Sequence, residues 1–176
     1  MALFIKKDAT FQPLQIAVLT VSDTRTLQDD TSGSTLVECI TKADHVVAGR
    51  EIVKDDVYLL RAVFSQWIAD STVDVIIATG GTGLTGRDVT PKAVKPLLDK
   101  DIPGFGELFR MLSYEEIGTS TIESLALGGV ANGTLIFSIP GSTGACRTAW
   151  ERILQLQLDS RTGPCNLVEV RTRFFE

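Results

Sequence analysis

The chain has 176 residues, of which 44% are hydrophobic and 22% charged, a balance that excludes a disordered or collagen-like chain and is typical of one globular domain. Its net charge of −5 disfavours binding to a phosphate backbone, so we expect no nucleic-acid partner. No apolar stretch approaches the roughly 20 residues of a membrane helix, and none follows the first residues as a secretory signal would. We therefore expect a single domain over residues 1–176 that makes no membrane contact and is cytoplasmic.

Short β-rich runs alternate with helical patterns along the first half of the chain. The runs cover residues 14–21, 46–53 and 73–79. Helices are expected over 34–43, after a polar loop from Ser22 to Gly33, from a cap at Asp55 or Asp56 onwards, and from Thr90–Pro91. The run over 73–79 is almost continuously apolar, which is typical of a central strand in a parallel sheet.

The second half of the chain repeats this alternation less regularly. We expect a helix after Pro103–Gly104, a short helix over 120–127, a central strand over 134–139 and a helix over 145–158. Strands that alternate with helices predict an α/β fold, in which helices cover both faces of a mostly parallel, doubly wound sheet. The predicted fold is a three-layer domain with its core at about 14–158 and a peripheral C-terminal tail from Thr162.

Histidine and cysteine are too few and too scattered for the common metal and nucleophile chemistries. The chain has one histidine, His45, and three cysteines, Cys39, Cys146 and Cys165. Their spacing fits neither a zinc site nor a thioredoxin-type pair, so we expect neither. Reduced, buried thiols are the expected state of the cysteines. A Ser-His-Asp or Cys-His mechanism would have to use His45.

A glycine-rich loop follows the predicted strand over 73–79. Residues 80–86 contain four glycines, which let backbone N–H groups approach a ligand with no Cβ in the way, so the loop suits phosphate. A plain tight turn is the alternative interpretation. The spacing Gly81-x-Gly83-x-x-Gly86 matches a dinucleotide fingerprint, but Thr90–Pro91 opens the next helix in place of the glycines, and no Walker Gly-Lys-Ser/Thr follows.

Acidic and basic side chains lie near this loop. Because ligands of open α/β sheets bind beyond the carboxyl ends of the strands, we expect Asp55 and Asp88 on adjacent loops, where paired carboxylates favour Mg²⁺. Either aspartate could instead cap a helix. Glu107 follows a Pro-Gly-Phe-Gly segment that allows close approach of a ligand, or it only complements a helix dipole. Three arginines could face phosphate or solvent: Arg87, Arg110 and Arg147.

Several motifs in a fixed order resemble those of one protein family. Thr79-Gly80-Gly81-Thr82-Gly83 is followed by Arg87-Asp88-Val89-Thr90-Pro91, Pro103-Gly104-Phe105-Gly106-Glu107 and Pro140-Gly141-Ser142. With these motifs, from about Leu14 to the last helix, the chain resembles the MoaB/MogA family of molybdopterin-binding proteins of molybdenum cofactor biosynthesis. Its segments Asp29-Asp30-Thr31-Ser32-Gly33 and Phe109-Arg110-Met111-Leu112-Ser113 are most similar to the MoaB branch.

The resemblance implies a homotrimer or homohexamer that transfers AMP from ATP to molybdopterin with Mg²⁺ and releases pyrophosphate. It implies that Asp55 and Asp88 are the catalytic acids and the Mg²⁺ ligands, and that other enzymes of molybdenum cofactor biosynthesis are partners. The implied substrate and phosphate contacts are Ser22, Gly80, Gly81, Thr82, Gly83, Glu107, Pro140, Gly141 and Ser142. Thr143 departs from the Pro-Gly-x-Pro of adenylyltransferase members, so the substrate contact at this loop is expected to differ.

Two other functions remain open at this point. A non-catalytic molybdopterin-binding or carrier protein would keep the fold and the glycine loop but lack turnover. A nicotinamide or flavin enzyme would use the GxGxxG match, against the arguments given above. Phe174–Phe175 is more apolar than a free terminus needs, which indicates either subunit packing or a surface pair.

Overall fold

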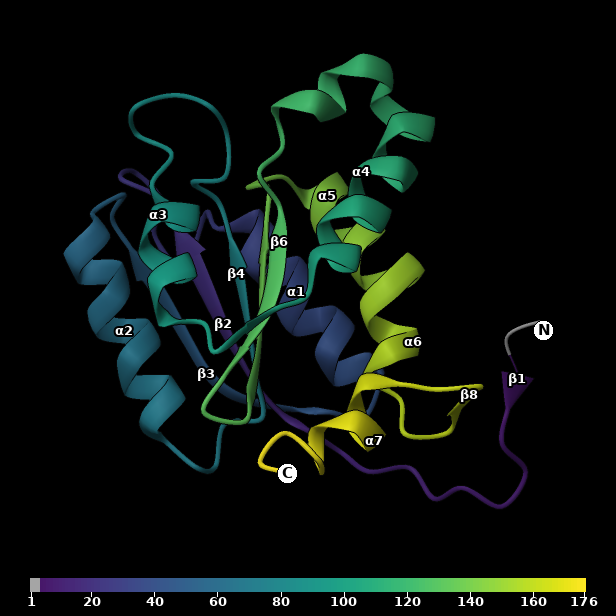
Figure 1. Ribbon diagram of the computed structural model, residues 1–176. Helices are drawn as coiled ribbons and strands as arrows, with labels where there is room; N and C mark the ends of the chain where they lie inside the picture. The colour runs from purple at the N-terminus through teal and green to yellow at the C-terminus, as the bar shows by residue number, and fades with distance from the viewer. Residues whose placement is uncertain (1–3) are drawn as a thin grey trace.

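A six-stranded sheet forms the centre of the fold (Figure 1). The structure, a computed structural model, describes residues 4–176 and has the strand order β3-β2-β4-β7-β6-β5. Four strands are parallel, namely β3 (Val46–Val53), β2 (Gln15–Val21), β4 (Val75–Thr79) and β7 (Thr134–Ile139). β6 (Leu127–Ala131) is antiparallel to β7, and the short β5 (Lys100–Asp101) is antiparallel to β6. The predicted mostly parallel sheet is confirmed.

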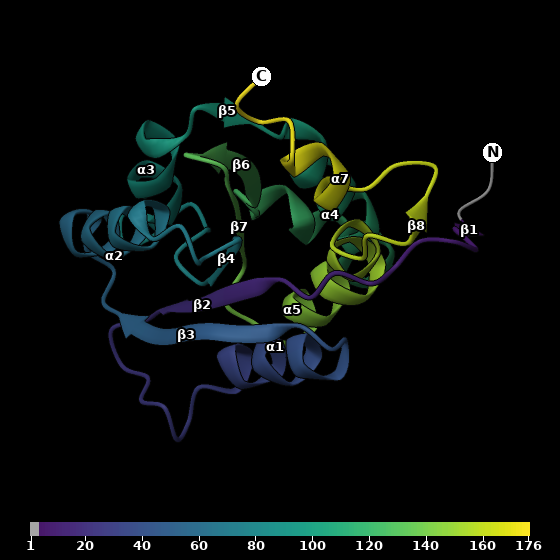
Figure 2. The ribbon, with the colours of Figure 1, turned by 90° about the horizontal axis from the view of Figure 1, so that it is seen from below.

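Helices cover both faces of this sheet, because side chains alternate between the faces along each buried strand. In β2, Ile16 and Val18 belong to one apolar core, whereas Ala17 and Leu19 belong to the other. The first core packs against α1 (Thr31–Lys42), α4 (Pro103–Ile117) and α5 (Thr143–Ala149), and the second against α2 (Val57–Ala69) and α3 (Thr90–Val94). Figure 2 shows α1 and α2 on opposite sides of β2 and β3. The predicted three layers are confirmed.

Short elements complete the fold. The 3₁₀ turn η1 (Lys95–Leu97) follows α3, and η2 (Gly118–Glu123) follows α4. α5 continues through a π-helical turn, η3 (Trp150–Leu154), into α6 (Gln155–Gln157). β1 (Phe4–Ile5) pairs with β8 (Thr162–Gly163) in a separate antiparallel ribbon, and α7 (Leu167–Arg171) follows. None of the helices within residues 4–176 is long and apolar enough to cross a membrane.

Helix α1 begins at Thr31 and not at Ser34, where the sequence predicts it. Asp30 is its N-cap residue, and the Asp30 Oδ1 accepts a hydrogen bond from the Gly33 N–H at 2.9 Å. Glycine has a low helix propensity, so position 33 is typical of a loop when the sequence is considered alone. The cap therefore determines the first turn of this helix against the local propensity.

One prediction for the second half of the chain is wrong, and one strand there was not predicted. The helix expected over 120–127 is the 3₁₀ turn η2, which ends at Glu123, and β6 starts at Leu127. Glycine has a low strand propensity, so the glycines inside β6 conceal the strand in the sequence. A Cβ at Gly129 would lie 2.9 Å from the Lys100 carbonyl oxygen, so a side chain there would collide with the backbone of β5.

The C-terminal tail is not peripheral, contrary to the prediction. Thr162 and Asn166 are buried, and Val168 belongs to the core that α5 covers. The Asn166 Nδ2 donates a hydrogen bond to the Thr162 carbonyl at 2.9 Å, and this bond within the tail stabilises the segment that packs against the core. The core therefore extends beyond residue 158.

Candidate functional site

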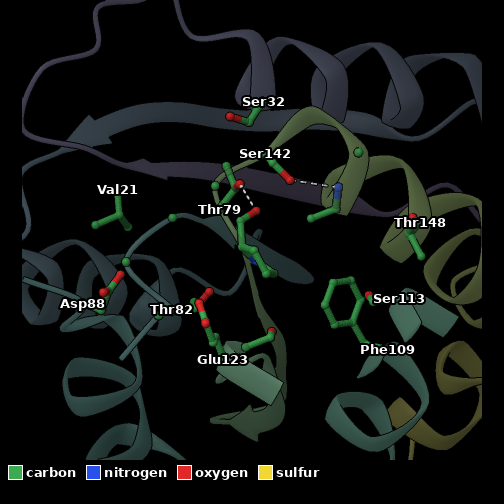
Figure 3. Close-up of a pocket in the computed structure, with 18 of the residues that line it drawn as sticks. Val21, Ser32, Thr79, Thr82, Asp88, Phe109, Ser113, Glu123, Ser142 and Thr148 are labelled. Carbon is green, nitrogen blue, oxygen red and sulfur yellow. Dashed lines mark hydrogen bonds between the residues drawn. The ribbon is translucent and has the colours of Figure 1, made fainter. Parts of the chain in front are cut away.

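A cavity of about 520 Å³ lies at the carboxyl ends of β2, β4 and β7 (Figure 3). Strand order reverses between β2 and β4, since β3 lies on one side of β2 and β4 on the other, and such switch points are the usual ligand sites of α/β sheets. The volume is in the range of small-molecule sites. The predicted site residues that line the cavity are Ser22, Gly80, Gly81, Thr82, Gly83, Asp88, Pro140, Gly141 and Ser142.

The glycine loop has a backbone shape that side chains would disrupt. Gly80 and Gly81 have φ angles of +106° and +62°, a region that favours glycine. Thr90 holds both residues, because its hydroxyl donates to the Gly80 carbonyl at 2.8 Å and its N–H donates to the Gly81 carbonyl at 3.0 Å. A Cβ at Gly141 would lie 3.1 Å from the Gly80 Cα, so the loops after β4 and β7 pack backbone against backbone. Gly86 has open space around it, so the GxGxxG spacing is not a structural requirement here.

Neither Asp55 nor Asp88 is a helix cap. The cap of α2 is Asp56, whose Oδ1 accepts hydrogen bonds from the N–H groups of Tyr58 and Leu59. The N-cap residue of α3 is Val89, which makes no side-chain cap. Asp88 instead closes the glycine loop, since its Oδ2 accepts from the Thr85 N–H at 2.9 Å and from the Thr85 hydroxyl at 2.6 Å.

The two aspartates lie close enough to influence each other electrostatically. Burial, together with the neighbouring Asp88 carboxylate, raises the pKa of Asp55. Burial alone would raise the pKa of Asp88 too, but hydrogen bonds from Thr85 and from the Gly83 N–H outweigh it and lower that pKa. Two adjacent carboxylates repel each other unless a cation lies between them.

Asp55 approaches the cavity from behind the glycine loop. It does not line the cavity itself, but a Cβ at Gly81 would lie 2.8 Å from the Asp55 Oδ1. Within residues 4–176, no other residue donates a hydrogen bond to the Asp55 carboxylate, and no cluster of three metal-ligating side chains occurs. A pair of carboxylates beside a phosphate loop still fits Mg²⁺, which takes one or two carboxylates and completes its shell with substrate phosphates and water.

Glu107 lies away from this site. It is exposed on α4 and borders a separate cavity of about 690 Å³. The glycine before it serves packing, because a Cβ at Gly106 would collide with the Ala126 carbonyl. The three arginines named from the sequence also bind protein groups: Arg87 pairs with Asp23, Arg110 donates to the Ala126 carbonyl at 3.0 Å, and Arg147 pairs with Glu151 at 3.6 Å.

The histidine lies at the opposite end of the sheet. His45 precedes β3, and its Nδ1 accepts a hydrogen bond from the Leu14 N–H at 3.1 Å. Burial lowers the pKa of His45, so the ring is neutral and serves the core. Of the cysteines, Cys39 and Cys146 are buried as predicted, but Cys165 is exposed. Burial raises the pKa of Cys146 to about 12.

Sequence reasoning missed a second wall of the cavity, formed by α4, η2 and α5. Its residues include Phe109, Ser113 and Glu116, which share one face of α4, and Thr148 on α5. The spacing of the first three, 109, 113 and 116, follows the helical repeat and could have indicated a common face. Arg25 also lines the cavity; its Nη1 donates to the Asp29 carbonyl at 2.6 Å.

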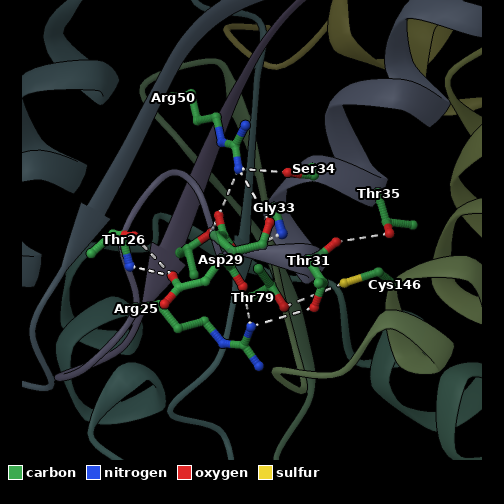
Figure 4. Close-up of polar contacts among 12 residues, drawn as sticks. Arg25, Thr26, Asp29, Thr31, Gly33, Ser34, Thr35, Arg50, Thr79 and Cys146 are labelled. Atoms are coloured by element: carbon green, nitrogen blue, oxygen red, sulfur yellow. Dashed lines mark hydrogen bonds and ion pairs between the residues drawn. The ribbon is translucent and has the colours of Figure 1, made fainter.

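A buried ion pair holds the loop that carries Arg25 (Figure 4). The Asp30 side chain is fully buried, and its Oδ2 accepts from the Arg50 Nη2 at 2.9 Å and from the Thr20 hydroxyl at 2.8 Å. Arg50 lies on β3 and also donates to Ser34 Oγ at 3.0 Å, so it links β3 to the start of α1. The pair therefore fixes the exit of β2, at one side of the cavity.

Comparison with known proteins identifies the family. Residues 17–160 match a family described as a probable molybdopterin binding domain. Molybdenum cofactor biosynthesis protein B of Escherichia coli K12 is 57% identical over 156 residues, which cover 89% of this chain and 92% of that protein. The chain belongs to the MoaB/MogA molybdopterin-binding family. The resemblance based on its motifs is confirmed.

Other members of the MoaB/MogA family agree in sequence and structure. The Staphylococcus carnosus protein of the same name is 48% identical, with 83% of this chain and 87% of that protein covered. A crystal structure of molybdenum cofactor biosynthesis protein B superposes with a TM-score of 0.83 at 41% identity, covering 92% of this chain and 96% of that one. The tungsten cofactor synthesizing protein MoaB from Pyrococcus furiosus has a TM-score of 0.71 at 38% identity, with 81% and 91% covered.

The departure from the family's adenylyltransferase motif falls at a helix start. Thr143 is the first residue of α5, and Ser142 is its N-cap, whose Oγ accepts from the Ala145 N–H at 3.1 Å. Proline is tolerated at that first position because its missing N–H would be unpaired anyway. Thr143 in place of proline therefore keeps the helix start and adds one N–H donor beside the cavity.

Proposed function

We propose that this chain binds molybdopterin and adenylylates it with Mg-ATP, giving adenylyl-molybdopterin and pyrophosphate in molybdenum cofactor biosynthesis. The observation that carries the proposal is the convergence of two glycine-bearing loops and Asp88 on one cavity, with the Asp55 carboxylate beside Gly81, where burial and the nearby Asp88 carboxylate raise the pKa of Asp55. Family membership supports the pterin as ligand. The paired carboxylates support a cation-dependent reaction of phosphates.

The chemistry requires little acid or base catalysis. An oxygen of the molybdopterin phosphate attacks the α-phosphorus of ATP, and the bond from that phosphorus to the pyrophosphate breaks as the new P–O bond forms. The attacking oxygen is already anionic, so no general base is needed, and the distance of His45 from the cavity is no obstacle. The protein has to align two anions and compensate their charge.

The residues of the cavity divide this task. The Gly80 N–H donates to the Ile139 carbonyl and the Gly83 N–H to Asp88, so the Gly81 and Thr82 N–H groups, with the hydroxyls of Ser22 and Ser142, would hold phosphate oxygens. Among the described residues that line the cavity, Arg25 is the only cationic one. It adds positive charge where the chain leaves β2. Asp55 and Asp88 would hold Mg²⁺, which neutralises part of the triphosphate charge when bound.

The decisive experiment mixes the purified chain with molybdopterin, ATP and Mg²⁺ and measures adenylyl-molybdopterin and pyrophosphate. Asp88→Asn should abolish AMP transfer and largely spare pterin binding. Asp56→Asn is the matched control, because Asp56 is an exposed cap beside Asp55 and asparagine also caps helices. Transfer retained by the Asp88 variant, or lost equally in the control, would contradict the assigned role.

A carrier function is the second candidate, and the Thr143 departure favours it. A carrier would bind molybdopterin with the same loops but show no turnover in this assay with the wild-type chain. Tight pterin binding without formation of adenylyl-molybdopterin would therefore support the carrier function. Thr143→Pro would then be the first variant to test for a gain of AMP transfer.

We also propose a cytoplasmic homotrimer or homohexamer. Apolar side chains exposed on α4 and η2, among them Met111, Tyr114 and Ile122, offer an area for subunit contact. Phe174 packs against the core, whereas Phe175 is exposed with its ring over Gly133. The mass in solution, measured by light scattering, would test the oligomer directly.

A further inference from the structure

The two walls of the cavity have opposite hydrogen-bonding character. The wall at the sheet edge presents the backbone N–H donors of Gly81 and Thr82 in the glycine loop. The wall from α4 and α5 presents Glu116 together with Phe109, Ser113 and Thr148. Figure 3 shows Phe109, Ser113 and Thr148 grouped on the side of the cavity away from Asp88. A ligand with acceptors at one end and donors at the other would satisfy both walls.

Glu116 is held in place by a buried partner. The Thr148 hydroxyl on α5 donates a hydrogen bond to the Glu116 Oε1 on α4 at 2.7 Å. Thr148 is only 5% exposed, so the bond joins the two helices of this wall at a packed point. Among the described residues, 4–176, no group donates to the second carboxylate oxygen, Oε2. Because a carboxylate offers about four lone-pair positions, both oxygens can still accept.

The charge of Glu116 determines what this wall can bind. A carboxylate repels a phosphate unless a cation lies beside it, and the Mg²⁺ proposed at Asp55 and Asp88 would serve the glycine loop but not Glu116, so the phosphates of a ligand are directed to the glycine loop and away from α4. A carboxylate attracts paired N–H donors, and two adjacent donors match its two oxygens. Phe109, an almost fully buried aromatic ring, also lines the cavity and gives this wall an apolar surface for a flat heterocycle.

We propose that Glu116 accepts hydrogen bonds from the aminopyrimidinone edge of the pterin, where a ring N–H and the exocyclic amino group are adjacent donors. The inference rests on the proposed function, because it assigns the ring of the same substrate to the wall opposite the phosphate loop. Thr148 positions Glu116 in this role. Glu116 thus selects a 2-amino pteridine over its 2-oxo counterpart, in which a carbonyl oxygen would face the carboxylate.

The test compares two probes and three proteins. The probes are a pterin with a phosphomethyl group at C6 and the matching lumazine, which carries a 2-oxo group in place of the 2-amino group. The proteins are the wild type, Glu116→Gln and Glu115→Gln. Glu115 is a matched control, since it neighbours Glu116 on α4 but pairs with Arg152 at 3.0 Å and does not line the cavity. Dissociation constants come from the change in pteridine fluorescence, and ATP binding and melting temperature are measured alongside.

Wild type and Glu115→Gln should bind the pterin more tightly than the lumazine. Glu116→Gln keeps the side-chain volume and one acceptor for Thr148, but presents an amide N–H₂ to the pterin donors. Its pterin affinity should fall about 10- to 100-fold, its preference between the probes should disappear, and its ATP affinity and melting temperature should not change.

The outcomes separate this inference from the proposed function. Equal binding of both probes by the wild type, or unchanged preference in Glu116→Gln, overturns the inference, whereas AMP transfer by the wild type would still support the proposed function. If Glu116→Gln no longer discriminates between the two probes and the wild type shows no AMP transfer, the inference is supported and the protein is a carrier. A wild type that binds neither probe refutes both. If Glu116→Gln fails to fold, Thr148→Val should show the same loss of preference in weaker form.

Discussion

Replacing Asp30 by asparagine should destabilise the chain strongly, although the change is isosteric. Asparagine keeps an oxygen for the Gly33 N–H and so keeps the cap of α1. Its amide N–H₂ would face the Arg50 Nη2, which can only donate, so the guanidinium loses its counter-charge inside the protein. Breaking a buried pair in this way costs about 3 to 5 kcal/mol. The Arg50 side chain is 23% exposed, and water can solvate part of the charge, so we expect about 3 kcal/mol.

The assays are urea unfolding, which gives the free energy of unfolding, and thermal unfolding, both followed by circular dichroism. A loss of about 3 kcal/mol should lower the melting temperature by about 6 to 12 °C for a domain of this size. Asp29→Asn is the control, because Asp29 is exposed and its Oδ1, which accepts from the Thr26 hydroxyl at 3.1 Å, is retained in asparagine. That variant should lose less than about 1 kcal/mol. An Asp30 variant no less stable than the control would refute the reasoning.

Two extensions sharpen the prediction for Asp30. Adding Arg50→Met to Asp30→Asn should restore part of the stability, since the uncompensated charge is then removed. Burial raises the pKa of Asp30, but the Gly33 N–H, Arg50 and Thr20 outweigh it, so the net effect lowers the pKa below 3.8. The stabilisation is therefore present above pH 3.8 and lost as the pH falls below it. The stability difference between wild type and variant should be constant from neutral pH down to about 5 and shrink below 3.8.

Three further predictions follow from the site and the thiols. Asp55→Asn should raise the melting temperature at pH 7 while reducing AMP transfer. Burial and the neighbouring carboxylate raise the pKa of Asp55 in the folded state, so ionisation of Asp55 disfavours folding at neutral pH. The gain in melting temperature should vanish below pH 3.8, where Asp55 is protonated in both the folded and the unfolded state. Gly81→Ala should abolish transfer and destabilise the chain by about 1 to 3 kcal/mol, because of its positive φ and a Cβ 2.8 Å from Asp55 Oδ1; Gly86→Ala should leave both unchanged. Iodoacetamide at pH 8 should label Cys165 rapidly in the native chain and leave Cys146 unlabelled, as mass spectrometry of peptides would show.

The strands that carry the site could be predicted because each is a short apolar run. The run over 134–139 and the strand β7 (Thr134–Ile139) coincide, since a buried strand needs apolar side chains on both faces. Loops that follow such strands meet at one edge, so the glycine loop and the loop after β7 could be placed together from sequence alone. Strand β6 could not be found, because its glycines are required by tertiary contacts: Gly128 packs against Phe105 and Phe137, and Gly129 against Leu98 and the Lys100 carbonyl.

Site residues could be predicted where they directly follow a strand in the sequence. They could not be predicted where the packing of a distant helix places them at the cavity. Asp88 follows the glycine loop directly, whereas Glu116 reaches the cavity only through the orientation of α4. Glu107 shows the converse case: the glycines before it resemble a ligand-binding turn, but Gly106 makes room for the Ala126 carbonyl and Glu107 borders a separate cavity. The ion-pair partner of Asp30 could not be predicted from the sequence either, because Arg50 lies on a different element, the strand β3.

The backbone contact between Gly80 and Gly141 has a consequence for redesign of this protein. A side chain at Gly141 would press on Gly80, and one at Gly80 would collide with the Val21 carbonyl, so these two glycines of the phosphate half of the cavity cannot be varied. The helical half lines the cavity with side chains, since Ser113 and Glu116 lie on one face of α4 and have no such contact between backbones. A library aimed at new heterocycles would therefore randomise the helical wall and keep the sheet edge constant, and every variant in it would inherit the same phosphate chemistry.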